Sequence, residues 1–142
     1  MYQKTLLPLD GSSAAEEAIP YALELRRLSG GTLTLVRVVP HNIAAAELWH
    51  IHQRQLEAEA ELYLAKVAAR LDVTAEHLQY SIISGDVGQS LLTLIHQGPF
   101  DVLVMATRDR RDPVRWVLGS VADYLVQRAP IPVLLVRQNE EG

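Results

Sequence analysis

The chain has 142 residues, of which 49% are hydrophobic and 21% charged, and its formal net charge is −4. This length and composition predict one globular domain over residues 1–142 rather than a disordered chain. The absence of cysteine excludes disulfides, thiolate chemistry and cysteine-bound zinc. The acidic balance favours neither nucleic acid nor an acidic membrane surface. No apolar run reaches the roughly 18 residues that span a bilayer, and Met1-Tyr2-Gln3-Lys4 does not resemble a signal peptide, so we expect a cytoplasmic protein without a membrane anchor.

The first third of the chain alternates strand and helix patterns. Residues 5–9 predict a strand that ends at Asp10-Gly11-Ser12-Ser13, where the serines are good helix N-caps. Pro8 conflicts with an inner position for this strand, because proline lacks the N–H group that the sheet needs. An amphipathic helix follows, and Pro20 should kink it or delay its start. Residues 32–38 predict a second strand of the buried type.

The rest of the chain continues the alternation. It predicts helices at about 44–71, 89–96 and 119–128, and strands at 78–84, 101–106 and 133–137. Strands that are apolar throughout, each joined to the next by a helix, predict a parallel sheet with helices on both faces. Such sheets bind ligands beyond the carboxyl ends of their strands, where the winding direction reverses.

Three segments should therefore converge at one edge of the sheet. They are Pro8-Leu9-Asp10-Gly11-Ser12, Met105-Ala106-Thr107-Arg108-Asp109 and Gly119-Ser120-Val121. The third begins a helix, whose N–H groups and positive dipole end favour an anion. A second interpretation is that Ser120 is only an N-cap. Four nearby arginines, Arg108, Arg110, Arg111 and Arg115, are either a solvated loop or part of an anion site.

Several segments together resemble the universal stress protein family. They are Leu6-Leu7-Pro8-Leu9-Asp10-Gly11-Ser12 at the start, Gly85-Asp86 and Asp101-Val102-Leu103-Val104-Met105 in the middle, and residues 118–125 and 129–137 at the end. The resemblance covers nearly the whole chain. It implies a five-stranded parallel α/β sheet of strand order 3-2-1-4-5, a Rossmann-like sandwich with helices on both faces, in a protein that is usually dimeric.

The resemblance also implies a ligand. Nucleotide-binding members of the family hold ATP with a motif written Gly-x2-Gly-x9-Gly-Ser/Thr. By this resemblance Asp10 would bind the adenine or ribose side, and Val38 would offer its backbone to adenine. Gly119, Ser120 and Val121 would hold the phosphates of ATP or AMP, with magnesium as the accompanying ion. Nine residues, 110–118, separate Asp109 from Gly119, which is the spacing of the motif.

The two earlier glycines of the motif are replaced by Ala106 and Asp109. Ala106 adds one methyl group, which a negative φ would tolerate. Asp109 adds a side chain and a negative charge where backbone should approach phosphate. Like charges at about 4 Å repel by roughly 1–4 kcal/mol near a protein surface. The replacements therefore predict nucleotide binding that is weakened or altered, unless the arginines offset them.

Two functions stay open on the sequence alone. The first is a small stress-response regulator that binds an adenine nucleotide weakly or in an altered way. The second is a dimeric module that binds an unidentified protein partner and keeps a vestigial nucleotide cleft. No acid–base or nucleophile set is evident, so we expect no conventional enzyme and at most slow ATP hydrolysis. We also expect no metal site, because the five histidines do not form a ligand pattern.

The last strand predicts the oligomeric state. Val133-Leu134-Leu135-Val136 is short and apolar, and it falls at the edge of the sheet in the expected strand order. Exposed apolar edges favour pairing with another chain. We therefore expect a homodimer built on this strand.

Overall fold

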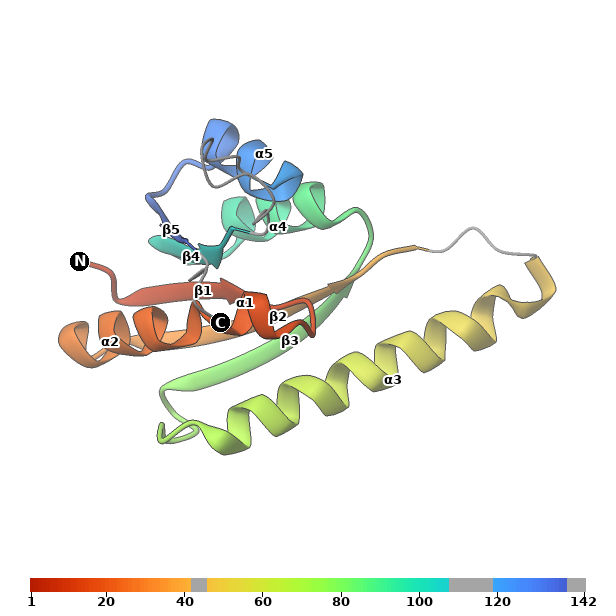
Figure 1. Cartoon of the computed structure of the whole chain (residues 1–142), viewed down its shortest axis with the longest axis horizontal. Helices are drawn as coiled ribbons and strands as arrows, with labels where there is room; N and C mark the ends of the chain where they lie inside the picture. Colours follow the sequence, from red (N-terminus) through yellow and green to blue (C-terminus); the bar gives the residue numbers. More distant parts are fainter. Residues whose placement is uncertain (42–45, 108–118, 138–142) are drawn as a thin grey trace.

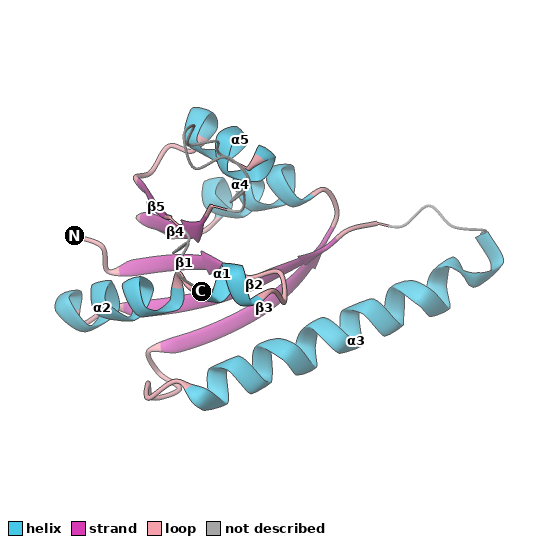
Figure 2. Ribbon diagram, in the orientation of Figure 1, coloured by secondary structure: helices cyan, strands magenta, loops and turns pink. Residues whose placement is uncertain are grey.

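The computed structural model describes residues 1–41, 46–107 and 119–137, which form one parallel sheet flanked by helices (Figure 2). The strands are β1 (Lys4–Pro8), β2 (Thr32–Val39), β3 (Leu78–Ser84), β4 (Val102–Ala106) and β5 (Val133–Val136). The helices are α1 (Ser13–Glu16), α2 (Ile19–Ser29), α3 (Ala46–Arg70), α4 (Val87–Gln97) and α5 (Ser120–Arg128). The strands lie in the order β3-β2-β1-β4-β5, which confirms the expected fold class.

Helices cover the sheet on two sides, with α1, α2 and α3 on one face and α4 and α5 on the other (Figure 1). Successive side chains of a strand point to opposite faces, so a strand covered on both faces must be apolar at every position. Leu6 and Leu7 of β1 are both fully buried. Leu7 packs on the face covered by α1, α2 and α3, and Leu6 packs on the face covered by α4 and α5. Burying each such leucine stabilises the fold by about 1.5–3 kcal/mol relative to leaving it exposed.

The helix boundaries follow local capping. The Oγ of Ser12 accepts a hydrogen bond from the N of Ala15 at 3.1 Å, which confirms the predicted N-cap. Pro20 lies in the first turn of α2, which begins at Ile19 after α1 has ended at Glu16. The proline therefore delays the start of the main helix, as the sequence predicted. The helix expected at 89–96 begins two residues earlier, because the Asp86 carboxylate accepts a bond from the N of Gln89 at 3.0 Å and caps it.

Pro8 fits the central strand because of where its missing donor falls. The N of Leu9 donates to the O of Val36 in β2 at 2.8 Å. The N–H groups of a strand alternate in direction, so the nitrogen of Pro8 faces β4. The pairing of β1 with β4 is confined to Thr5 and Leu6. Pro8 therefore lies where the two strands have already stopped pairing.

The longest helix, α3, has 25 residues, and its first turns extend past the ends of the strands (Figure 1). It buries Ala60, Leu64 and Val67 against the sheet, whereas Leu62 is exposed on its outer side. Within the described ranges, no helix is both long and apolar enough to cross a membrane.

Candidate nucleotide-binding site

A small cavity opens where β1 and β4 stop pairing, at the carboxyl ends of the strands. Its volume is about 130 Å³. The residues around it come from three strand ends and three helices; they are Pro8, Leu9, Asp10, Ala15, Val38, Val87, Leu91, Met105, Ala106 and Val121. The strand order reverses between β1 and β4, and parallel sheets place ligands at such a point. The lining is apolar except for Asp10, which is the usual make-up of a small-molecule site.

A second, larger cavity adjoins the first. Its volume is about 560 Å³, and it shares Val87 and Val121 with the smaller cavity. Its other described lining residues are Pro40, His41, Gly85, Asp86, Gly88, Ser120 and Tyr124. The ring of Tyr124 is covered by the Arg128 guanidinium, 4.2 Å from the ring centroid. Val87 at the start of α4 and Val121 at the start of α5 line both cavities, and we refer to the two adjoining cavities together as the depression.

The Asp10 carboxylate is held by the turn that follows β1. Its Oδ1 accepts hydrogen bonds from the N of Ser12 at 2.9 Å and from the Oγ of Ser12 at 2.5 Å. Gly11 has φ +89°, a left-handed conformation that favours glycine. A Cβ on Gly11 would lie 3.1 Å from the Arg37 guanidinium, so a side chain there would displace Arg37. The turn therefore fixes a carboxylate at the edge of the cavity.

The N-terminus of α5 is the second polar feature of the site. Gly119 is the N-cap, with φ −62° and ψ 156°, and Ser120 is the first helical residue. The interpretation of Ser120 as an N-cap is therefore wrong, because Gly119 already has the extended backbone of that position. The N–H groups of Ser120, Val121 and Ala122 have no acceptor within the helix, and its first backbone bond runs from the N of Asp123 to the O of Gly119 at 2.9 Å. Because Ser120 and Val121 line the larger cavity, the positive end of the helix lies beside that cavity.

Most of the predicted residues that the structure describes are brought together. Seven of them, Pro8, Leu9, Asp10, Val38, Met105, Ala106 and Val121, line the smaller cavity. Gly11 and Ser12 form the adjacent turn, and Gly119 and Ser120 begin α5. Ala106 is in β4, and Tyr2 alone among the described non-glycine residues has a positive φ, so the extra methyl group of Ala106 meets no backbone conflict.

Other predictions for the site have a different outcome. Thr107 is 3% exposed, and its N donates to the O of Val136 at 2.9 Å, so it continues the sheet and does not line either cavity. Arg108 and Asp109, with Arg110, Arg111 and Arg115, lie outside the described residues. Ala15, Val87 and Leu91 were missed as lining residues. Helical periodicity marks Ala15 and Leu91 only as core positions, and Val87 precedes the helix that the sequence predicted at 89–96.

The expected edge strand is confirmed as an edge. Among the described strands, β5 pairs with β4 and lies last in the order. Leu134, in the middle of β5, is 39% exposed, although Val136 is buried. An apolar side chain is therefore available on an open sheet edge.

Comparison with known proteins extends these observations. The chain is 24% identical to universal stress protein MJ0531 of Methanocaldococcus jannaschii over 97% of this chain and 84% of that protein. Its fold is similar to the solved structure of protein MJ0577 of the same organism, with a TM-score of 0.85, 22% identity and 99% of each chain covered.

Two solved structures that contain nucleotides are also similar in fold. One is a universal stress protein in complex with cAMP, with a TM-score of 0.63, 22% identity and coverage of 97% of this chain and 98% of that one. The other is the Arabidopsis thaliana protein At3g01520 with AMP bound, with a TM-score of 0.68, 17% identity and coverage of 98% and 94%. Residues 1–137 match the universal stress protein family as a whole, and the chain belongs to that family.

Proposed function

We propose that this universal stress protein is a cytoplasmic regulator that binds an adenine nucleotide at the carboxyl ends of β1, β2 and β4. The observation that carries the proposal is the apolar cavity at the strand-order reversal, with a fixed carboxylate on one side and the N-terminus of α5 on the other. The similar family structures with cAMP and with AMP support the same class of ligand.

The chemistry of the two sides suits the two ends of a nucleotide. An apolar cavity excludes water from a flat base, and the Asp10 carboxylate can accept a hydrogen bond from an amino or hydroxyl group. The N–H groups at the start of α5 can donate to phosphate, and an anion at such an end gains about 0.3–1 kcal/mol at an exposed site. The replacements at Ala106 and Asp109 lead us to expect weak binding, with AMP and Mg²⁺-ATP as the probes.

Val121 provides the test, because it lines both cavities from the first turn of α5. We expect Val121→Phe to fill the space and weaken AMP at least about tenfold, which is about 1.4 kcal/mol. Val126→Phe is the matched control, since Val126 is on the same helix, is 44% exposed and lines neither cavity. The measurement is calorimetric titration of AMP, Mg²⁺-ATP and adenosine into the three proteins.

The result that contradicts the proposal is a parent protein that binds none of these probes at millimolar concentration. That result would leave the protein-interaction module as the better function, with the depression as a vestigial cleft. Equal weakening by Val121→Phe and Val126→Phe would place the ligand elsewhere on the molecule.

We also propose that the protein is a homodimer that pairs through β5. The support is the open edge of β5 and the exposed side chain of Leu134. We expect Leu134→Lys to give monomer in light scattering at tens of micromolar, since a charge opposes edge pairing. Tyr80→Lys is the control, because Tyr80 is 41% exposed on β3, the other edge strand. A parent that is monomeric, or a Leu134→Lys protein that stays dimeric, would contradict this assembly.

A further inference from the structure

The helix that carries the Asp10 turn cannot hold its own position. α1 has four residues, and none of its side chains is fully buried. A helix this short is unstable in isolation, because forming the first turn costs more than its few hydrogen bonds return. Its placement beside the cavity must therefore come from contacts with other elements.

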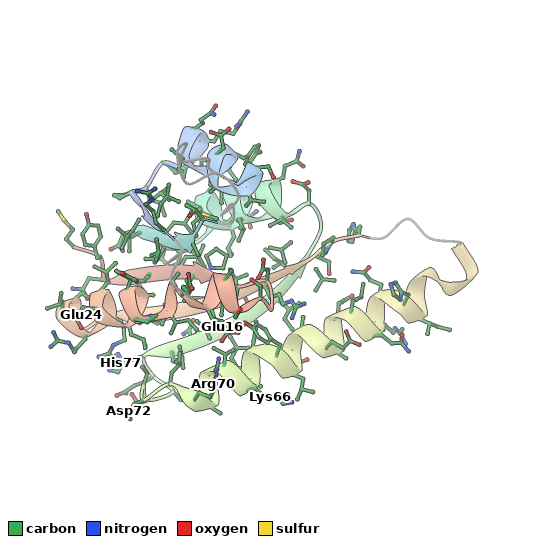
Figure 3. The ribbon with its side chains drawn as sticks, viewed as in Figure 1. Glu16, Glu24, Lys66, Arg70, Asp72 and His77 are labelled. Carbon is green, nitrogen blue, oxygen red and sulfur yellow. The ribbon has the colours of Figure 1, made fainter. Side chains whose placement is uncertain are left out.

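Ala15 of α1 packs against the buried core, and the side-chain hydrogen bonds that Glu16 of α1 accepts come from α3. The Oε1 of Glu16 accepts a hydrogen bond from the Arg70 guanidinium at 2.7 Å, and its Oε2 accepts one from the Tyr63 hydroxyl at 2.7 Å. Figure 3 shows Glu16 and Arg70 reaching toward each other from the two helices. Both carboxylate oxygens of Glu16 are thus occupied by residues that lie 47 and 54 positions away in the sequence.

The electrostatics of Glu16 agree with this geometry. Burial alone would raise the pKa of the Glu16 carboxyl, but the hydrogen bonds from Arg70 and Tyr63 outweigh it and the pKa is lowered. Burial and the bond to Glu16 raise the pKa of the Tyr63 hydroxyl, which agrees with its role as a protonated donor to the Glu16 carboxylate. Glu16 is therefore a charged acceptor between two donors.

The Glu16 carboxylate is connected to the Asp10 turn through α1 and its N-cap. Glu16 ends α1, and Ser12 begins it as the N-cap. The Ser12 Oγ accepts from the N of Ala15 and donates to the Oδ1 of Asp10. A movement of α1 that breaks the cap would therefore also release the Asp10 carboxylate.

Tyr63 supports the same turn by a second route. The Arg37 guanidinium lies over the Tyr63 ring, 5.1 Å from its centroid, and the same guanidinium packs against Gly11. The ring of Tyr63 thus supports Arg37 behind the turn, while its hydroxyl holds Glu16 at the end of α1. Two contacts from one side chain of α3 converge on residues 10–16.

We propose that Tyr63 and Arg70 are positioning residues for the ligand site: through Glu16 they fix α1 and with it the Asp10 turn. The effect on a ligand rests on the proposed function, whereas the effect on α1 can be measured without any ligand. The site therefore depends on a helix that does not line either described cavity.

The test uses three variants and two controls. Tyr63→Phe removes the hydroxyl but keeps the ring under Arg37, Glu16→Gln removes the charge, and Arg70→Gln removes the cation. Glu24→Gln is the matched control, since Glu24 bonds Arg27 on the same helix α2 and lies away from Glu16 (Figure 3). Val67→Ala controls for general stability, because Val67 is a buried α3 residue outside the contacts of Glu16.

Two readouts separate positioning from stability. We expect the three variants to weaken AMP by about threefold to tenfold, in the range for residues that act through a contiguous network. We expect the amide protons of Glu16 and Glu17 to exchange with solvent at least about fivefold faster, because local opening of α1 costs less. Glu24→Gln should leave both values within about twofold, and Val67→Ala should lower the melting temperature without changing either.

Each outcome is decisive. Variants that bind AMP and exchange their α1 amides like the parent would overturn the proposal, as would a Val67→Ala protein that loses AMP affinity equally. A parent that does not bind AMP would overturn the proposed function instead. In that case the exchange rates alone would still decide whether Tyr63 and Arg70 fix α1.

Discussion

The two ends of the central strands are built differently. At the amino end, the Asp101 carboxylate accepts hydrogen bonds from the backbone N of Gln3 at 2.9 Å and of Lys4 at 3.0 Å, and the N of Thr32 donates to the O of Gln3 at 2.7 Å. At the carboxyl end, β1 and β4 stop pairing before Pro8 and a cavity opens between them. The same strands are thus joined tightly at one end and separated at the other.

This difference shows how the fold divides its tasks. Satisfied backbone groups at the amino end stabilise the sheet, since each net hydrogen bond contributes about 0.5–1.5 kcal/mol. The carboxyl end forgoes some of that pairing, and the N–H groups that begin α5 have no acceptor within their helix. Changes at the amino end should therefore affect stability, and changes at the carboxyl end should affect binding.

The largest expected effect is at Gly31. A Cβ on Gly31 would lie 2.0 Å from the carbonyl oxygen of Gln3, so β1 and β2 would have to move apart. We expect Gly31→Ala to lower the free energy of unfolding by about 3–5 kcal/mol in urea titrations. Gly30→Ala should cost only about 1–2 kcal/mol, because Gly30 has φ +73° but nothing lies within 4 Å of its added methyl group.

The AMP affinity of the folded fraction should be unchanged in both glycine variants, since neither residue lines the site. Equal costs for the two substitutions would mean that the amino end adjusts easily. A loss of AMP affinity in Gly31→Ala would mean that the two ends are not independent.

The smallest expected effect is the pH dependence of the contacts behind the Asp10 turn. The folded state lowers the pKa of Glu16, so the stability that Glu16 adds is present above its unfolded value near 4.5 and is lost as pH falls through the lower folded value. We expect Glu16→Gln to reduce the melting temperature by about 2–4 °C at pH 7. The difference from the parent should shrink steadily below pH 4.5.

Thermal unfolding of both proteins between pH 3 and pH 8 measures this dependence. The control is Glu24→Gln, whose partner Arg27 lies three residues away on an exposed surface. A difference between parent and Glu16→Gln that is constant down to pH 3 would show that the charge of Glu16 is not what holds α1.

Much of the fold could be predicted from the sequence, because its signals are local. The apolar strands, Ser12 as a cap and Pro20 as a helix start are all decided within a few residues. The strand order came from the family resemblance, and the structure has the same order. The resemblance also assigned Asp10 and Val38 to one site, and both residues line the smaller cavity. The position of Pro8 was a conflict on the sequence because the end of the β1–β4 pairing is a tertiary property.

The rest of the site depends on contacts between distant residues. Tyr63 and Arg70 are ordinary helix-surface residues by pattern, and only the packing of α3 beside α1 brings them to Glu16. Tyr124 and His41 likewise line the larger cavity only because α5 and the end of β2 lie close together. Gly119 rather than Ser120 is the N-cap of α5, because Gly119 has the extended backbone conformation of that position. Residue type alone does not specify this conformation.

The most direct test of the account is a map of amide chemical shifts during a titration with AMP. We expect the shifts to change at residues 9–12, in the strand end and turn that hold Asp10, and at Ser120 and Val121, which line the larger cavity. The amides of Gln3, Gly31 and Asp101 at the opposite end should stay unchanged. No change at millimolar AMP, or changes concentrated at the amino end of the strands, would contradict nucleotide binding at the carboxyl end.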